Sequence, residues 1–255
     1  MALYGPRGRV WCLTDRAIAA GDCAESSVVL GRSRVAWERG SLVVDVDERT
    51  APFGGLFGRP VRGRITLHPT SSPLAVAPLD EAGAHLWWPV APRARVEVAL
   101  SEPDVRFAGE GYHDANAGPE PLEAAFRRWT WSRAHAPDGR TLLVYDVELA
   151  GGARRSRRIA ADPRGREVDL ARTTDADVGR TLWRLSRVAA RDEGARATLR
   201  RTLEDTPFYA RSLVDTTLGG ARVVAMHEEL SLERLGARWT QHLLSYRMGR
   251  PSWAR

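Results

Sequence analysis

The segment FAGEGYHDANAG, residues 107–118, places a phenol, a carboxylic acid and an amide at alternate positions. If the segment is extended, Tyr112, Asp114 and Asn116 point to the same side, because side chains alternate along a strand. Burial in an apolar cavity disfavours an ionised carboxylate, so Asp114 could stay protonated and act as a general acid near neutral pH. An aspartate that bonds backbone amides in a turn explains the sequence Asp-Ala-Asn-Ala-Gly equally simply. These residues alone leave both interpretations open.

A second segment, HLWW, supplies large aromatic rings beside a histidine. In a strand, His85 and Trp87 share one face and Trp88 takes the other. Indole faces attract cations, so a tryptophan beside an acid could stabilise the carbocation that forms when an alkene is protonated. Simple packing of two adjacent tryptophans is the alternative.

Geometry argues against a metal site. His85, His113 and Asp114 are the residue types of a two-histidine, one-carboxylate centre. However, adjacent strand residues point to opposite faces, so His113 and Asp114 do not easily bind one ion. The sequence also lacks the GxSxG, P-loop and GxGxxG motifs of other enzyme classes. We therefore predict a site without a metal.

Composition limits the partners and the location. All 38 basic residues are arginine, the net charge is +6 and the pI is about 10.1. This charge suits nucleic acid or an anionic membrane surface. The arginines are spread along the chain and accompany no nucleic-acid-binding module, so we expect membrane contact and no nucleic acid. With no long apolar run and no secretory signal, a cytoplasmic location is expected. Cys12 and Cys23 lack disulfide or metal spacing and are predicted to be buried thiols.

Most of the chain is predicted to form short strands. Apolar and polar residues alternate in stretches separated by Gly, Pro and Asp turns, of which the clearest are SLVVDVDE, GRITLHP, RARVEVAL, TLLVYDVELA and ARVVAMHEEL. Such close spacing, with little helix between strands, favours barrels or sandwiches over a parallel sheet. Short helices are predicted over residues 120–129 and about 231–246. A composition break at GPEP predicts a boundary between domains 1–122 and 123–255, with the acid segment in the first.

Taken in order, several stretches resemble the bacterial carotenoid 1,2-hydratases, also called hydroxyneurosporene synthases. They run from near residue 4 to near residue 248 and are VAWERGSLVVDVDE, GRPVRGRITLHP, HLWWPVAPRARVEV, GEGYHDANAGPEPLEAAFRRWTWSRA, RTLWRL, RTLEDTPFYARS and MHEELSLERL. The resemblance implies an all-β protein with two lipocalin-like antiparallel β-barrel domains and a few short helices. Family members carry a further segment before the part equivalent to ALYGPRGRVW, so the first barrel is expected to be incomplete at its N-terminus.

The resemblance also implies a reaction, the addition of water across the terminal C1=C2 double bond of acyclic carotenoids such as neurosporene or lycopene, without an organic cofactor or metal. Asp114 is expected to protonate the alkene, and Trp87 and Tyr112 to hold the cation through their π faces, worth about 1–2 kcal/mol each. His85 either orients the acid or positions the water. Asn116 is expected to hydrogen-bond Asp114. The side chains expected to bind substrate or support the site are Asn116, Trp88, Trp129, Trp131 and Arg133. The implied partners are an acyclic carotenoid, water and the lipid of the inner or photosynthetic membrane.

Two other functions would keep the same aromatic cavity. A non-catalytic lipocalin-like carotenoid carrier would need no protonated acid inside it. A terpenoid cyclase or isomerase would use the same acid but exclude water. The pairing of Asp114 with Tyr112 favours an enzyme, and the resemblance favours the hydratase.

Overall fold

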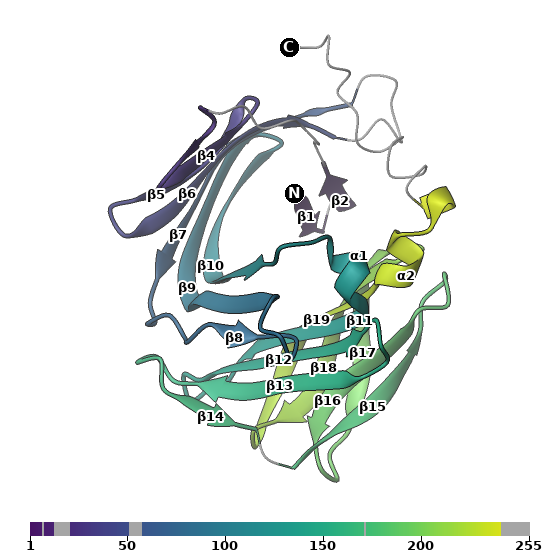
Figure 1. Cartoon of the computed structure of the whole chain (residues 1–255). Helices are drawn as coiled ribbons and strands as arrows, with labels where there is room; N and C mark the ends of the chain where they lie inside the picture. The colour runs from purple at the N-terminus through teal and green to yellow at the C-terminus, as the bar shows by residue number, and fades with distance from the viewer. Residues whose placement is uncertain (7, 13–20, 51–57, 171, 241–255) are drawn as a thin grey trace. The chain divides into compact units, whose positions relative to one another are not determined.

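The computed structural model describes residues 1–6, 8–12, 21–50, 58–170 and 172–240, which form antiparallel strands almost throughout (Figure 1). In chain order the strands are β1 (Ala2–Gly5), β2 (Gly8–Trp11), β3 (Cys23–Ala24), β4 (Ser27–Leu30), β5 (Ser33–Glu38), β6 (Ser41–Arg49), β7 (Pro60–Pro69), β8 (Ala77–Pro78), β9 (Leu86–Glu102), β10 (Asp104–Ala117), β11 (Phe126–His135), β12 (Thr141–Leu149), β13 (Arg154–Ala161), β14 (Glu167–Asp169), β15 (Thr173–Arg180), β16 (Ser186–Asp192), β17 (Ala197–Asp205), β18 (Tyr209–Leu218) and β19 (Ala221–Ser231). The prediction of an all-β antiparallel protein is confirmed.

The first of the two predicted helices is shorter than predicted. Helix α1 (Leu122–Ala125) gives way to β11 at Phe126, so the helix predicted over residues 120–129 is wrong in its second half. From there the burial of side chains alternates with the period of two of a strand, which outweighs the helical preference of LEAA. Helix α2 (Leu232–Leu235) ends at Gly236, and residues 238–240 are helical again. The last residues of that predicted helix lie outside the described part of the chain.

The chain divides into two compact units. Among the described residues, unit 1 comprises those within 1–70 and 94–111, and unit 2 comprises those within 71–93 and 112–240. Strands β9 and β10 each contribute residues to both units. All of the residues predicted to form the site belong to unit 2. The sequence-based division into domains stays a prediction.

Most strands of unit 1 belong to a sheet of order β10-β9-β7-β6-β5-β4-β3, in which β8 also pairs with β9. Strands β1 and β2 pair in a separate ribbon. A small core of this unit contains Cys12, Val46 and Val61. Both cysteines are free, but Cys12 is buried and Cys23 is exposed, so the prediction of a buried thiol is wrong for Cys23. Cys23 lies in the short outermost strand β3, where little covers it.

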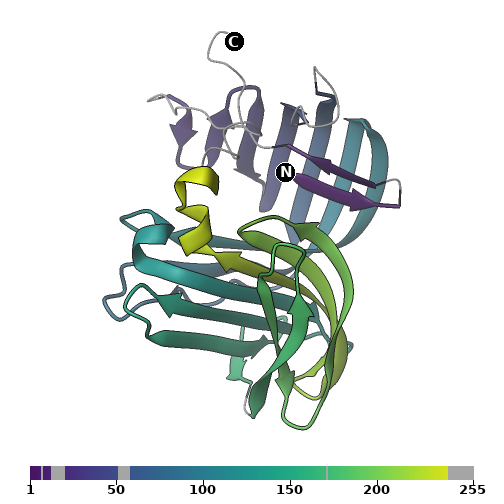
Figure 2. The ribbon, with the colours of Figure 1, turned by 90° about the vertical axis from the view of Figure 1, so that its right-hand side faces the viewer.

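Unit 2 contains a sheet of order β14-β13-β12-β11-β19-β18-β17, and the hairpin β15–β16 packs on one face of it (Figures 1 and 2). Strand register decides which side chains share a face. Trp131 of β11 lies opposite Tyr145 of β12 and Glu228 of β19, so these three side chains point to the same side. We call this side the aromatic face. Thr130 and Ser132 point to the other side, the hairpin face, which β15–β16 covers.

Each face has its own apolar core. The core on the aromatic face joins the sheet to the segment before and within β9, and its buried members are Leu74, Leu79, Trp87, Phe126, Leu143, Tyr145, Val147, Ile159, Ala161, Leu230 and Leu232. The core on the hairpin face is built mainly from small residues, among them Ala134, Ala160 and Ala190. The aromatic face therefore carries the large rings to which the predicted site belongs.

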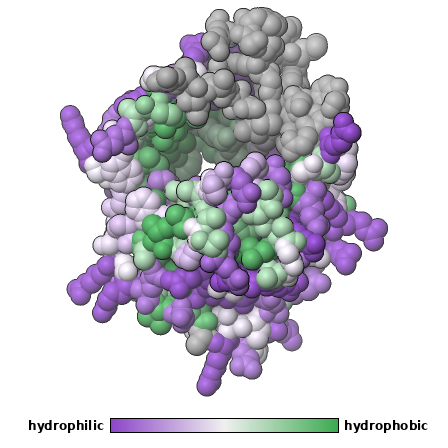
Figure 3. Space-filling model, in the orientation of Figure 1, coloured by the Kyte–Doolittle hydropathy of each residue, from purple (hydrophilic) through white to green (hydrophobic). Residues whose placement is uncertain are grey.

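The visible surface of unit 2 is mostly hydrophilic, with a few apolar groups among the polar ones (Figure 3). Among the described residues, none of the helices is both long and apolar enough to cross a bilayer.

Candidate active site

A carboxyl group with two hydrogen-bond donors lies at the centre of the predicted site. Oδ2 of Asp114 accepts a bond from the indole N–H of Trp87 at 2.8 Å and another from the hydroxyl of Tyr112 at 3.0 Å. Oδ1 has no hydrogen-bond partner among the described residues. Asp114 is partly exposed rather than enclosed, so the burial expected for it is incomplete. The arrangement fixes one carboxyl oxygen and leaves the other open.

Tyr112 is held from several sides. Its ring lies 5.3 Å from that of Trp131, and the Arg133 guanidinium lies 5.4 Å from the ring centroid. Burial and the nearby Asp114 carboxylate raise the pKa of Tyr112 well above its ordinary value. The phenol therefore stays protonated and keeps its hydrogen for the bond to Asp114.

Trp87 is fully buried and belongs to a group of rings. Its ring lies 5.1 Å from Tyr145, and Tyr145 lies 6.0 Å from Trp129. The Tyr145 hydroxyl donates to Oδ1 of Asn116 at 3.3 Å. Asn116 had been expected to hydrogen-bond Asp114, but it bonds Tyr145 instead. Burial, with Asp114 nearby, raises the pKa of Tyr145. Tyr145 was missed by the sequence reasoning, although it is the only polar aromatic residue in the predicted strand TLLVYDVELA.

His85 is anchored by an aspartate that the sequence reasoning also missed. Nδ1 of His85 contacts Oδ2 of Asp80 at 2.7 Å, and the His85 backbone N–H donates to the same oxygen at 2.8 Å. Burial opposes ionisation of Asp80, but the bonds from His85 and from the Ala84 backbone outweigh it and lower the pKa of Asp80. The contact at Nδ1 favours the tautomer with its proton there, which leaves Nε2 as an acceptor.

The other ring nitrogen of His85 faces Gly118. Nε2 is buried and has no hydrogen-bond partner among the described residues. A Cβ atom at Gly118 would lie 2.4 Å from Cδ2 and 2.9 Å from Nε2 of His85, so only glycine fits there. Phe126 contacts the ring edge-on at 4.9 Å. Gly118 is four residues beyond Asp114, which corresponds to roughly 13 Å along an extended chain at about 3.3 Å per residue, so the His85 ring is displaced along the segment from the acid.

Two candidate residues point elsewhere. The Trp88 indole N–H donates to the Leu74 carbonyl at 3.0 Å, and the side chain is 40% exposed, on the face opposite Trp87. His113 follows Tyr112 and precedes Asp114, and burial lowers its pKa. The described residues contain no group of three metal-binding side chains, and the absence of a metal from the reaction stays a prediction.

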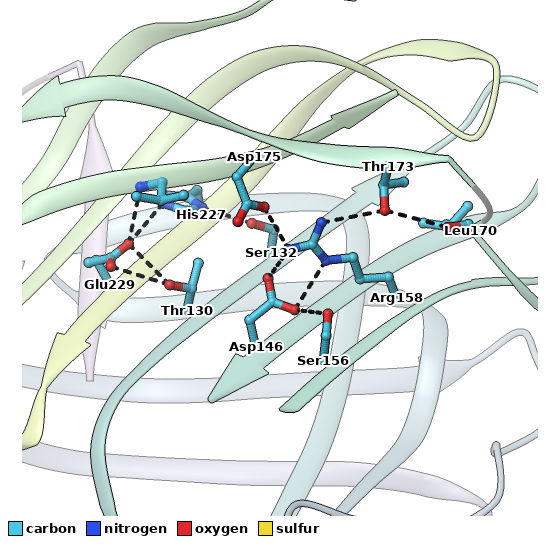
Figure 4. A network of polar contacts seen from close by, with 11 residues as sticks. Thr130, Ser132, Asp146, Ser156, Arg158, Leu170, Thr173, Asp175, His227 and Glu229 are labelled. Carbon is cyan, nitrogen blue, oxygen red and sulfur yellow. Dashed lines mark hydrogen bonds and ion pairs between the residues drawn. The ribbon is translucent and has the colours of Figure 1, made fainter. Parts of the chain in front are cut away.

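A second polar cluster lies on the hairpin face (Figure 4). Nδ1 of His227 lies 2.8 Å from the Ser132 hydroxyl, and Nε2 lies 3.4 Å from Oε2 of Glu229. The Glu229 carboxylate accepts from Arg128 and, at 3.2 Å, from Thr130. Burial and the positive charges of Arg187 and Arg128 lower the pKa of His227 to about 4. His227 and Glu229 are both buried, and their period of two in ARVVAMHEEL was the available signal for a buried polar pair.

The same cluster continues to the edge of unit 2 (Figure 4). Arg158 bonds Asp146 and Asp175, each at 2.6 Å, and so ties β13 to β12 and β15. A hollow of about 330 Å³ adjoins it, with Arg128, Asp146 and Arg158 in its lining. These groups are paired with one another and share no residue with the Asp114 site, so we assign them to the stability of the sheet.

Comparison with known proteins points to one family. A family model described as "Carotenoid hydratase CrtC" matches residues 1–255. Curated proteins named acyclic carotenoid 1,2-hydratase are 41% identical over 251 residues in Thiocapsa roseopersicina, 37% over 252 residues in Rubrivivax gelatinosus and 37% over 257 residues in Cereibacter sphaeroides. These matches cover 98%, 98% and 100% of this chain. The chain spans 61% of the length of the first two relatives and 89% of the third.

Solved structures with the same fold are more distant in sequence. A Nitrosomonas europaea protein described as AttH gives a TM-score of 0.59 at 13% identity and covers 81% of this chain and 69% of its own. Kievitone hydratase from Nectria haematococca gives 0.55 at 13% identity, with 80% and 69% covered. At this identity the likeness extends to the fold alone, and it agrees with the predicted fold class.

Proposed function

Because the chain belongs to the carotenoid hydratase family, we propose that it adds water across the terminal C1=C2 double bond of an acyclic carotenoid. The observation that carries the proposal is the Asp114 carboxyl group, whose Oδ2 is held by Trp87 and Tyr112 while Oδ1 is left open. An unactivated alkene reacts with water only after protonation by an acid, and the two donors orient the Asp114 carboxyl group for that role.

The first step is proton transfer from Oδ1 of Asp114 to C2, which leaves a tertiary cation at C1. The donors on Oδ2 stabilise the carboxylate that forms when Asp114 gives up its proton. The apolar substrate has the opposite effect beforehand, because covering the carboxyl group with hydrocarbon removes water and disfavours its charged form.

The geometry favours a positioning role for the two aromatic donors. Trp87 is fully buried with Tyr145 against its ring, and a guanidinium already lies near the Tyr112 ring. A cation near the Tyr112 ring would meet like charge from Arg133. The new carboxylate of Asp114 is then the main counter-charge for the cation, stabilised in turn by the bonds from Trp87 and Tyr112.

Water attacks C1 in the second step, and its released proton returns to the Asp114 carboxylate, which restores the acid. His85 fits the role of positioning this water better than that of orienting the acid. Its Nδ1 is committed to Asp80, and Asp114 is already oriented by other donors. Nε2 of His85 is the acceptor that could hold the water.

The partners in this proposal are the carotenoid, water and the surface of the membrane that contains the substrate, with no nucleic acid, metal or organic cofactor. The location that follows is the cytoplasmic side of the inner or photosynthetic membrane. We also propose that residues 1–122 and 123–255 form two separate domains.

Isotope labelling tests the reaction directly. Incubation with lycopene or neurosporene in D₂O is expected to give a 1-hydroxy product with deuterium at C2, and incubation in H₂¹⁸O a product with the heavy oxygen at C1. Deuterium without heavy oxygen in a rearranged product would indicate a cyclase or isomerase. Tight carotenoid binding without any product would indicate a carrier.

A further inference from the structure

The turn between β15 and β16 presents two large apolar side chains to solvent. Leu182 is 93% exposed and Trp183 is 49% exposed. They occupy the two central positions of a turn closed by a bond of 2.9 Å from the Arg184 N–H to the Thr181 carbonyl. Such positions usually carry Gly, Asn, Asp or Pro. We call residues 181–184 the tip; it forms part of RTLWRL, a stretch that the proposed reaction does not use.

The tip is rigidly held although its side chains are exposed. The Leu182 N–H donates to Oδ2 of Asp205 at 2.8 Å, and Nη1 of Arg234 donates to the Trp183 carbonyl at 2.7 Å. At the base of the tip, the Leu185 N–H donates to the Thr181 hydroxyl at 3.0 Å. The backbone that carries the exposed pair is therefore fixed before it meets any partner, so little backbone conformational entropy is lost on binding.

The charge around the tip is mainly positive. Arg180 and Arg184 flank the apolar pair, are exposed, and form no ion pair with any residue that the structure describes. Arg234 adds a third guanidinium through its bond to the tip backbone. Asp205 is occupied by the Leu182 N–H, and Glu233 on α2 lies 3.6 Å from Arg127. An apolar pair between unpaired arginines complements the surface of a lipid bilayer, in which anionic headgroups cover an apolar layer of acyl chains.

We propose that the tip is a membrane anchor, in which Leu182 and Trp183 enter the boundary between headgroups and acyl chains while Arg180 and Arg184 contact anionic headgroups. Tryptophan favours this interfacial region, and arginine is attracted by negatively charged lipids. A leucine at the outermost point can be buried in lipid without displacing any protein contact. The inference rests on the proposed function to the extent that a carotenoid substrate lies in a membrane.

Vesicle binding tests the anchor without reference to catalysis. The full chain is mixed with vesicles of equal parts phosphatidylglycerol and phosphatidylcholine, and bound protein is separated by flotation. The double variant Leu182→Ser/Trp183→Ser is expected to bind at least ~10-fold more weakly than the parent. Arg180→Gln and Arg184→Gln are each expected to weaken binding about fivefold at low salt, and less at high salt.

A matched control removes exposed apolar groups elsewhere. Trp37 and Val168 are 38% and 67% exposed on β5 and β14, and Trp37→Ser/Val168→Ser is expected to bind vesicles like the parent. Circular dichroism melts confirm that each variant is folded. Equal binding by the parent and the tip variant would overturn the anchor. Loss of dimers in the tip variant by size-exclusion chromatography, with unchanged vesicle binding, would assign the tip to a second copy and also overturn it.

A detergent assay separates this proposal from the proposed reaction. With carotenoid dispersed in detergent, the tip variant is expected to match the parent, whereas with carotenoid in vesicles it is expected to be slower. Failure of the parent in detergent would contradict the hydratase and leave the vesicle-binding result to decide the anchor. Slower turnover by the tip variant in detergent as well would place the tip in substrate handling and contradict a pure anchor.

Discussion

His227 makes a specific prediction about stability and pH. It is buried on the hairpin face, and its surroundings lower its pKa to about 4, compared with about 6.5 in an unfolded chain. The groups that face it are Arg187 and Arg128, which oppose protonation, and Glu229, which favours it. Between these two pKa values the unfolded chain binds a proton that the folded chain does not. Stability is therefore complete above about pH 6.5 and is lost as the pH falls toward about 4.

The magnitude follows from the two pKa values. A difference of about 2.5 units corresponds to about 3 kcal/mol over the whole window and about 2 kcal/mol at pH 5. Urea unfolding at about pH 7.5 and pH 5 measures the loss in the parent and in His227→Gln, which lacks the titrating ring. The variant is expected to lose about 2 kcal/mol less between the two pH values than the parent. Equal losses in both proteins would show that the pKa of His227 is the same in the folded and unfolded states and would refute the reasoning.

Three further predictions concern the aromatic face. Tyr112→Phe removes one donor to the proposed acid while keeping the ring, and is expected to lower turnover by about 10- to 100-fold with little change in carotenoid binding; an unchanged rate would remove the phenol from the mechanism. Gly118→Ala places a methyl group 2.4 Å from the His85 ring and is expected to lower the free energy of unfolding in urea by about 1–3 kcal/mol. Gly109→Ala places its methyl group in open space and is expected to leave stability unchanged. Equal changes in the two variants would contradict the close contact at Gly118. Tyr145→Phe removes only a hydrogen bond of 3.3 Å, so the free energy of unfolding in urea is expected to fall by about 1 kcal/mol or less. A larger fall would indicate a further role for the Tyr145 hydroxyl.

Much of the fold could be predicted from alternation along single strands. TLLVYDVELA and ARVVAMHEEL coincide with β12 and β19 to within a residue at either end. The prediction of a helix over residues 120–129 was wrong in its second half because a short helix and a strand share that segment. Strand β11 places Phe126 in the core. Local helical preference could not reveal this, since the outcome depends on pairing with β12 and β19.

The site was predictable where contacts are local. Tyr112 and Asp114 are two residues apart, and their bond follows from the period of a strand. Tyr145 and Asp80 were not predictable, because Tyr145 reaches the site from another sheet and Asp80 sits in a segment that resembles an ordinary turn. Partial exposure of Asp114 also could not be read from the sequence, since it depends on how neighbouring strands cover the carboxyl group.

The most direct test of the account is the conversion of lycopene or neurosporene by the parent and by Asp114→Asn, with the 1-hydroxy product identified by mass and retention. The amide keeps the size of the side chain but cannot deliver the proton, so a loss of about 10²- to 10⁴-fold is expected while carotenoid binding and thermal stability are retained. Equal product from both proteins would show that Asp114 is not the acid and would contradict the mechanism.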